Sequence, residues 1–373
     1  MKRRGLLLGL VSWVGALVFV GAMGLFGPRA DAQQGPPPHA LARVIAVQER
    51  HTERLMSLPD VVGTAVGLDE MGRPVVKVYV AHAGVRGIPS VIDGEKVEVE
   101  VTGEIYALGA LAALEDPAEP SEVDRLSWFD RPVPIGVSAF NATEFSAATL
   151  GCRVTDGTNV YALSCNHVYA RTNSASLGEA IWQPGPYDVV MTLRKQWNPA
   201  DPTYVIGALA GFVQIDFSSS GENYVDAAIA LVSTDTVGTS TPSGGYGTPS
   251  SETSTAYVGM RVQKYGRTTR LTYGTISGVN ATVIVNYGIG QAKFVGQISV
   301  KGSRFIQPGD SGSLLVTRTS NKPVGLLFAG NSSGSFAIAN PIDLVLDELE
   351  RELGDVDDDG VGDIEVALVI DGQ

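Results

Sequence analysis

Short apolar segments separated by turn residues fill the chain from residue 135 to about 341, and they limit the folds open to it. Segments such as 160–164, 227–232 and 324–328 are rich in Val, Leu and Ala, and Gly, Asn, Ser and Pro separate them. About ten such segments precede a helical pattern at 342–353, a spacing typical of all-β barrels or sandwiches. We therefore predict a mainly β domain over residues 135–353.

A different pattern precedes this region. Residues 39–58 carry apolar side chains at helical spacing, and residues 61–68, 74–80 and 96–102 alternate like strands. This order predicts a small α+β module over residues 39–110. Its three histidines have no obvious partners in the sequence, so a role in folding or docking is favoured over catalysis. A segment rich in Pro and Glu, residues 111–134, is predicted to be a linker.

The first 32 residues have the layout of a secretory signal peptide. Three basic residues at positions 2–4 precede an apolar run from residue 5 to 26, and small residues follow. Because this run is long, an uncleaved membrane anchor is the alternative, and only then would the protein contact a membrane. We expect the protein to be secreted or associated with the cell envelope. Its formal net charge of −13 would repel phosphate backbones, so nucleic acid is not expected as a partner.

Cys152 and Cys165 are the only cysteines. Two thiols without clustered histidines cannot complete a zinc site, and an exported chain favours disulfides. We therefore predict a disulfide between them, with two free buried thiols as the alternative.

The acidic tail, residues 355–373, places carboxylates at alternate positions around a glycine. This spacing follows the first half of a calcium loop, but the bidentate glutamate of an EF-hand is missing at the twelfth position. A structural Ca²⁺ site and a solvated acidic tail both stay open, and no organic cofactor is implied. The candidate ligands are Asp355, Asp357, Asp359 and Asp363.

A serine lies between two glycines in the sequence GDSG at residues 309–312, directly before an apolar segment. A nucleophilic serine needs a base within hydrogen-bonding reach and a third group that orients the base. The N–H groups of Gly309 and Ser311 can converge on one point, as oxyanion stabilisation requires. Ser311 is therefore the candidate nucleophile.

The candidate base is His167, the single histidine of the β region, which follows the apolar segment 160–164. Asp226 begins a run of small and apolar residues, where a buried carboxylate needs a partner such as a histidine N–H. Asp216 is the rival acid.

The order His167, Asp226, Ser311 and the sequence GDSG resemble the triad and the signature of trypsin-like serine peptidases. The segments SCNHV at 164–168, QKYGRTT at 263–269 and VGLLFAG at 324–330 are similar to the bacterial branch related to plant narrow-leaf-type peptidases. The resemblance covers about residues 131–350. It implies a double six-stranded β-barrel, preceded here by the small α+β module, with the site in the cleft between the barrels. It also implies a serine endopeptidase that hydrolyses protein or peptide substrates through an acyl-enzyme.

Two of the three substrate-pocket positions depart from the family's pattern. Phe305 stands where an aspartate would favour cleavage after Lys or Arg, so we predict a preference for small or apolar residues. Phe328 replaces a serine on the strand after the nucleophile, while Gly330 can still pair with a substrate backbone. Because no freed N-terminus is evident to bind Asp310, we expect Asp310 to find its partners inside the fold.

Two other functions are considered. One is a catalytically inactive or latent trypsin-fold binding module associated with the cell envelope. The other is an α/β-hydrolase, which is disfavoured because the histidine precedes the serine and the motif G-x-S-x-G is incomplete.

Overall fold

The computed structural model describes residues 38–109, 125–354 and 366–373, which belong to one compact unit. The predicted signal segment, most of the predicted linker and the four candidate calcium ligands lie outside these described residues. Within the described part, no helix combines the length and apolarity needed to cross a membrane.

The first sheet closes into a barrel. Its strands are β6 (Ser138–Asn141), β7 (Ala148–Thr149), β8 (Cys152–Thr155), β9 (Val160–Ser164), β10 (Ala180–Trp182), β11 (Val205–Phe212) and β12 (Ala228–Val232). They pair in the order β8-β9-β12-β11-β10-β6-β7, and β19 (Val369–Ile370) lies beside β8. Only Leu150 and Gly151 separate β7 from β8, so the two form one bent strand that pairs with β6 at one end and with β9 at the other. Six strands therefore complete the ring.

The second sheet contains another closed ring. Its strands are β13 (Arg261–Gly266), β14 (Arg270–Asn286), β15 (Gln291–Lys301), β16 (Leu314–Thr317), β17 (Pro323–Gly330) and β18 (Phe336–Pro341). They pair in the order β13-β16-β17-β18-β15-β14, and an additional pairing of β13 with β14 closes the ring. The predicted double six-stranded, mainly β architecture is confirmed. β14 is one long strand, and register shifts around Gly278 and Ala281 bend it without ending it.

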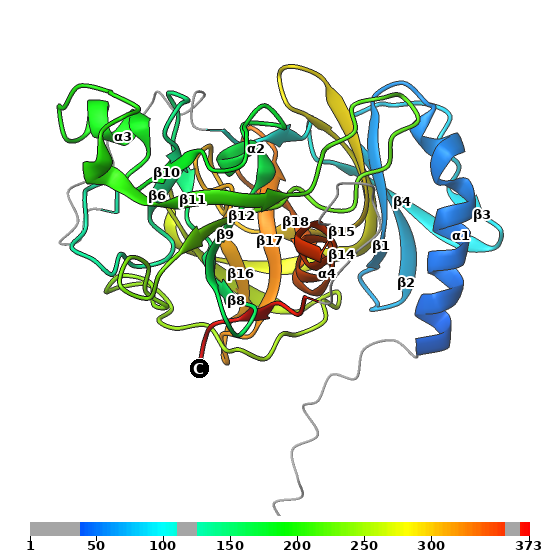
Figure 1. Cartoon of the computed structure of the whole chain (residues 1–373). Coiled ribbons are helices and arrows are strands. Elements are labelled where there is room, and N and C mark those ends of the chain that lie inside the picture. Colours follow the sequence, from blue (N-terminus) through cyan, green and yellow to red (C-terminus); the bar gives the residue numbers. More distant parts are fainter. Residues whose placement is uncertain (1–37, 110–124, 355–365) are drawn as a thin grey trace, which may run out of the picture. The chain divides into compact units, whose positions relative to one another are not determined.

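The N-terminal module extends the second sheet (Figure 1). Helix α1 (Pro38–Met56) packs through Val44, Val47 and Leu55 on a sheet of four strands. These strands are β1 (Val61–Leu68), β2 (Pro74–Val80), β3 (Val91–Ile92) and β4 (Glu95–Val101). β1 pairs antiparallel with β14, so the module shares main-chain hydrogen bonds with the second barrel.

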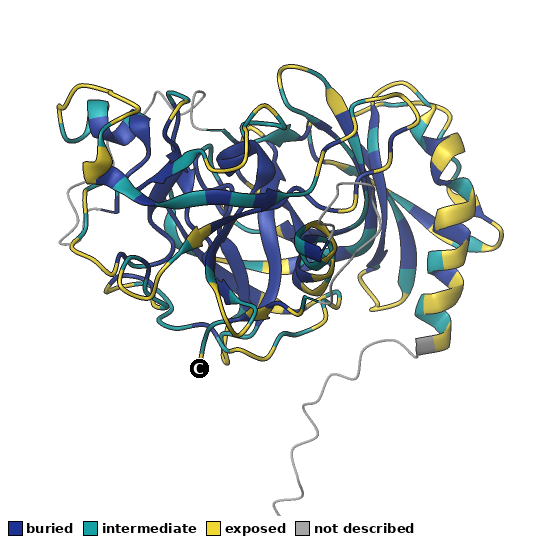
Figure 2. Cartoon of the chain, viewed as in Figure 1, coloured by how far each residue is buried: buried dark blue, intermediate teal, exposed yellow. Residues whose placement is uncertain are grey.

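The remaining elements lie outside the two rings and the four-stranded sheet of the N-terminal module. They are β5 (Tyr106–Ala107), α2 (Asn166–Tyr169), α3 (Pro186–Met191), the 3₁₀ turn η2 (Pro202–Tyr204) and α4 (Ile342–Gly354). β5 pairs antiparallel with β17 and parallel with β14. Every residue of β17 is buried, so β5 lies against a strand in the middle of the molecule (Figure 2).

Candidate active site

His167 and Asp226 meet at the end of two paired strands. β9 and β12 are antiparallel, and Ala228 of β12 pairs with Ser164 of β9. Asp226, two places before Ala228, therefore lies beside the helical turn α2, which follows β9. His167 Nδ1 is 2.6 Å from Asp226 Oδ2, and the backbone N–H of His167 donates to Oδ1 at 3.2 Å. Asp226 is fully buried and His167 is 6 % exposed. The rival Asp216 is exposed and accepts from the backbone of Ser218.

The other imidazole nitrogen of His167 is open. Nε2 is buried and has no hydrogen-bond partner among the residues that the structure describes. With Nδ1 donating to Asp226, Nε2 is the nitrogen that can accept a proton. The pair therefore has the arrangement of a general base held by a carboxylate.

Tyr287 is a member of the site that the sequence did not reveal. Its hydroxyl donates to Asp226 Oδ2 at 2.8 Å, and its ring lies edge-on to the imidazole of His167, with centroids 5.9 Å apart. Burial first, and then the charge of Asp226, raise the pKa of the Tyr287 phenol well above its ordinary value. Tyr287 follows β14 of the second barrel, so it joins the acid of the first barrel to the second. No motif in the sequence marks it.

Ser311 lies in a loop packed against the segment that carries His167. Thr149 donates its N–H to the carbonyl of Ser311 at 2.9 Å and accepts from Ser164 Oγ at 2.8 Å. The N–H of Gly312 and the thiol of Cys165 both donate to the carbonyl of Leu327. These shared partners bring residues 311–312 beside residues 164–165.

The hydroxyl of Ser311 is fully buried and donates to the carbonyl of Phe328 at 3.1 Å. That same carbonyl accepts from the N–H of Leu108 at 3.4 Å. The nucleophile candidate therefore points at the backbone of β17, next to a residue of the N-terminal module.

Gly309 and Gly312 both have positive φ, 95° and 89°, which L side chains rarely adopt. A Cβ at Gly309 would also lie 2.5 Å from Thr268 Oγ1, and one at Gly312 would overlap Ser164 Oγ. The glycines of the sequence GDSG thus fix the shape of the loop. The N–H of Gly309 donates to the carbonyl of Leu108 at 2.9 Å, so a predicted oxyanion donor is already engaged.

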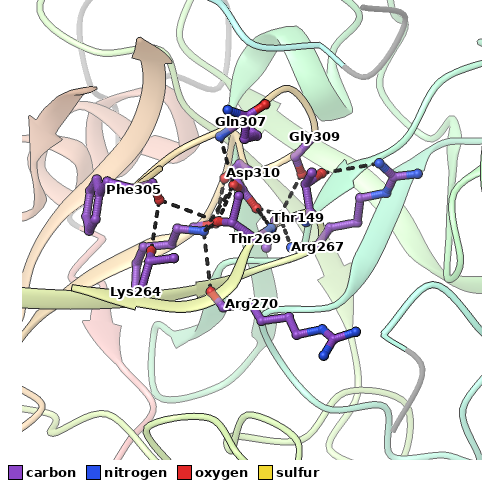
Figure 3. Close-up of polar contacts among 12 residues, drawn as sticks. Thr149, Lys264, Arg267, Thr269, Arg270, Phe305, Gln307, Gly309 and Asp310 are labelled. Carbon is purple, nitrogen blue, oxygen red and sulfur yellow. Dashed lines mark hydrogen bonds and ion pairs between the residues drawn. The ribbon is translucent and has the colours of Figure 1, made fainter. Parts of the chain in front are cut away.

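Asp310 holds this loop from inside the second barrel (Figure 3). Its carboxylate accepts from the N–H groups of Thr268, Thr269 and Gln307 and from Thr269 Oγ1, at 2.7 to 3.0 Å. Lys264 Nζ lies 3.1 Å from Oδ2, and both side chains are fully buried. Burial lowers the pKa of the Lys264 ammonium, and Asp310 opposes that shift. The internal partners of Asp310 thus come largely from the segment 263–269.

Two of the three pocket positions, Phe305 and Gly330, border one apolar region, whereas Phe328 belongs to another apolar cluster. Phe305 and Phe328 are fully buried, and Phe305 belongs to an apolar cluster with Ile306 and Leu108. A Cβ on Gly330 would lie 2.8 Å from Ile306 Cγ2 and 3.2 Å from Leu108 Cδ1. The side chain of Leu108 therefore fills the space that Phe305, Ile306 and Gly330 border.

The predicted disulfide is wrong in this structure, where Cys152 and Cys165 are free and buried. Cys152 faces Leu163 across β8 and β9, so Cys165 is only a diagonal neighbour, farther away than a disulfide usually allows. The thiol of Cys165 instead donates to the carbonyl of Leu327 at 3.4 Å.

Cys165, His167 and Asp226 place one potential metal-ligand atom each within 4.8 Å of one another. Burial first, and then the charge of Asp226, raise the pKa of the Cys165 thiol. Because a metal binds the thiolate, this environment disfavours metal binding. The cluster fits hydrogen bonding better than a metal centre.

Comparison with known proteins agrees with the resemblance seen in the motifs. The model of peptidase family S64 matches residues 190–352, a region that contains Asp226 and Ser311 and begins after His167. No curated protein matches the sequence.

The chain is also similar to solved bacterial proteases. Thermobifida fusca protease A is 21 % identical, with 58 % of this chain and 95 % of that chain covered at a TM-score of 0.40. A chymotrypsin from Cellulomonas bogoriensis is 22 % identical, with 58 % and 94 % covered at 0.38. A Nocardiopsis protease is 18 % identical, with 58 % and 97 % covered at 0.41. The family match, together with the two closed six-stranded barrels, confirms the resemblance to trypsin-like serine peptidases, while the plant-related branch stays a prediction.

Proposed function

We propose that the protein is a serine endopeptidase that uses Ser311, His167 and Asp226. The observation that carries this proposal is the buried imidazole of His167, which is fixed by Asp226 on one nitrogen and open on the other. An inert core histidine would be expected to satisfy both nitrogens. The match to peptidase family S64 supports the same chemistry.

The reaction follows from these roles. Ser311 Oγ attacks a peptide carbonyl while His167 Nε2 takes its proton, and Asp226 stabilises the imidazolium. The oxyanion is held by the N–H groups of Gly309 and Ser311. His167 then gives its proton to the leaving amine, and water hydrolyses the acyl-enzyme.

The apolar pocket supports a preference for an apolar residue on the acyl side of the cleaved bond. Phe305 and Ile306 offer no charge to a basic side chain, and Leu108 already fits between them and Gly330. A lysine placed there would lose its hydration without gaining an ionic partner.

One observation favours a second candidate, a latent trypsin-fold binding module. Ser311 is buried and its hydroxyl donates to Phe328, while Gly309 is engaged by Leu108. The described conformation is therefore closed to an external substrate. Such a module would keep this closed state permanently.

Labelling with a fluorophosphonate probe tests the proposal. Three chains are compared, and all three carry Leu108→Asp, which is chosen to open the pocket. They are the chain with the native serine, the variant Ser311→Ala and the variant Ser303→Ala. Ser303 is an exposed serine near the same loop and serves as the matched control. We expect labelling of the native serine chain and of Ser303→Ala, and none of Ser311→Ala. Equal labelling of all three would remove Ser311 as the nucleophile, and labelling of none would favour the binding module.

A further inference from the structure

We infer that an aromatic shelf, made of Phe145, Tyr187 and Trp197, binds the leaving-group side of the substrate and selects an aromatic residue there. This inference rests on the proposed function and adds the substrate class on the side of the bond that the apolar pocket does not contact. The aromatic shelf belongs to segments of the first barrel, whereas the apolar pocket belongs to the second.

The three rings of the aromatic shelf pack in a row. The ring centroids of Phe145 and Tyr187 are 5.6 Å apart, and those of Phe145 and Trp197 are 5.4 Å apart, with tilted planes. The N–H of Tyr187 donates to the carbonyl of Ser146 at 3.1 Å, and the indole N–H of Trp197 donates to the carbonyl of Ala142 at 2.9 Å. These hydrogen bonds tie helix α3 and the segment after it to the segment between β6 and β7.

The aromatic shelf keeps apolar surface accessible. Trp197 is 37 % exposed, and Phe145 and Tyr187 are only partly buried. Because the indole N–H of Trp197 is already used, what the ring offers to a ligand is its apolar face. Aromatic rings pair in offset or edge-to-face arrangements that stabilise a contact beyond the area they bury, so an aromatic side chain is the ligand that suits this surface.

Arg267 joins the aromatic shelf to the loop of the nucleophile. A Cβ placed on Gly309 would lie 3.0 Å from Nη1 of Arg267, and the guanidinium carbon lies 5.6 Å from the centre of the Tyr187 ring (Figure 3). Arg267 is buried and paired with the buried carboxylate of Asp188, so its position is fixed. Since an extended residue spans about 3.5 Å, the aromatic shelf lies about three residues from the oxyanion donor.

The direction of a bound peptide follows from the positions of the two barrels. Thr149 of β7 donates its N–H to the carbonyl of Ser311 and its hydroxyl to the carbonyl of Gly309, both at 2.9 Å. The segment that carries Phe145 therefore ends directly beside the loop of the nucleophile. An extended peptide whose acyl side lies in the apolar pocket of the second barrel passes Ser311 and then meets the first barrel, where the aromatic shelf lies.

One charge beside the aromatic shelf narrows the choice of residue. Glu144 precedes Phe145, and burial raises the pKa of its carboxyl, while the charges of Arg171 and His167 oppose that shift. Once ionised, Glu144 would repel a carboxylate of the substrate. A neutral aromatic side chain gains the ring contacts without this repulsion.

The test measures kcat/KM for internally quenched peptides that share Tyr-Ala-Leu before the cleaved bond. They carry Trp, Ala or Glu at the second, third or fourth position after it. The full chain, Trp197→Ala and the matched control Tyr257→Ala, an exposed aromatic residue that precedes β13, are compared, all with Leu108→Asp as in the labelling test. Leu108→Ala takes its place if Leu108→Asp does not fold.

We expect the native shelf to favour the Trp peptide over the Ala peptide about tenfold at one of these positions, with the Glu peptide slowest. Trp197→Ala should lose most of this preference, and Tyr257→Ala should keep it. Phe145→Leu, which removes the central ring but stays apolar, should also lower the preference and serves if Trp197→Ala does not fold. Fluorophosphonate labelling, which needs no residue on the leaving-group side, reports whether Ser311 is reactive in each chain.

Equal kcat/KM for the Trp and Ala peptides, or a preference that Trp197→Ala and Phe145→Leu leave intact, would overturn the inference. If Ser311 is labelled but the peptides are cut without preference, or not cut, the inference fails and the nucleophile assignment survives. If no chain is labelled and no peptide is cut, the proposed function fails together with the inference.

Discussion

Two buried aspartates flank the candidate nucleophile and its base, and their surroundings differ. Asp226, in the first barrel, accepts from the imidazole and the backbone N–H of His167 and from the phenol of Tyr287. Asp310, in the second barrel, accepts four hydrogen bonds and an ion pair from Lys264. Both carboxylates are fully buried.

The difference lies in what the partners can do with a proton. Asp226 is bonded to an imidazole whose second nitrogen has no hydrogen-bond partner among the described residues, which suits proton transfer. Asp310 is bonded to fixed donors and a lysine, which suits holding a loop in one shape. Under the proposed function, the same residue type would support catalysis in one place and architecture in the other.

The largest expected effect separates these two roles directly. Asp226→Asn should lower kcat about 10⁴-fold with little change in the unfolding midpoint, because the amide stabilises the wrong imidazole tautomer. Hydrolysis of a peptide ending in Tyr-Ala-Leu before a chromophore measures this loss. Comparable kcat for Asp226→Asn and the native enzyme would show that His167 does not depend on this carboxylate.

Lys264→Met tests the architectural side. Removing the cation leaves the Asp310 carboxylate buried without its ionic partner, which should lower the free energy of unfolding by about 3–5 kcal/mol. The double variant Lys264→Met, Asp310→Asn should recover part of that loss. Denaturant unfolding measures both, and an unchanged midpoint for the single variant would contradict the structural role.

Tyr287→Phe tests the link between the barrels. Losing one hydrogen bond to a charged group costs about 1.5–3 kcal/mol, and we expect a fall in kcat of about tenfold with KM unchanged. Because the pKa of Tyr287 is raised, the phenol stays protonated as pH rises and adds no alkaline limb to the pH profile. An alkaline limb that disappears in Tyr287→Phe would be the contrary result.

The smallest effect concerns the two buried thiols, of which Cys165 lies beside Asp226. Burial raises the pKa of both Cys152 and Cys165, so at about pH 8 almost no thiolate is present in the native state. We expect a disulfide-exchange reagent to modify neither cysteine in the native protein and both after denaturation. Two unreactive cysteines after denaturation without reductant would mean that the predicted disulfide forms.

The sequence was informative where a local pattern carries the signal. β9, β12 and β17 lie within a residue or two of their predicted segments, because short apolar runs between turns specify a strand locally. The predicted helices at 39–58 and 342–353 are observed as α1 and α4. The need of a buried carboxylate for a partner applies to Asp226 and to its rival Asp216 alike, and the structure pairs Asp226 with His167.

The sequence was uninformative where a contact joins distant residues of ordinary type. Tyr287 and Leu108 have no motif, and their roles follow only from the strands that position them. The disulfide failed for the same reason, because the register of β8 and β9 sets the two cysteines diagonally.

The chain by itself determined the β architecture, the order of its candidate site residues and the apolar character of its pocket, because these depend on patterns and residue types. Only the tertiary structure decided that the pocket is filled by the chain's own Leu108, that Tyr287 binds the acid and that Lys264 holds the loop. Each of these contacts requires two distant strands to be closed into a barrel in one register before the side chains can meet.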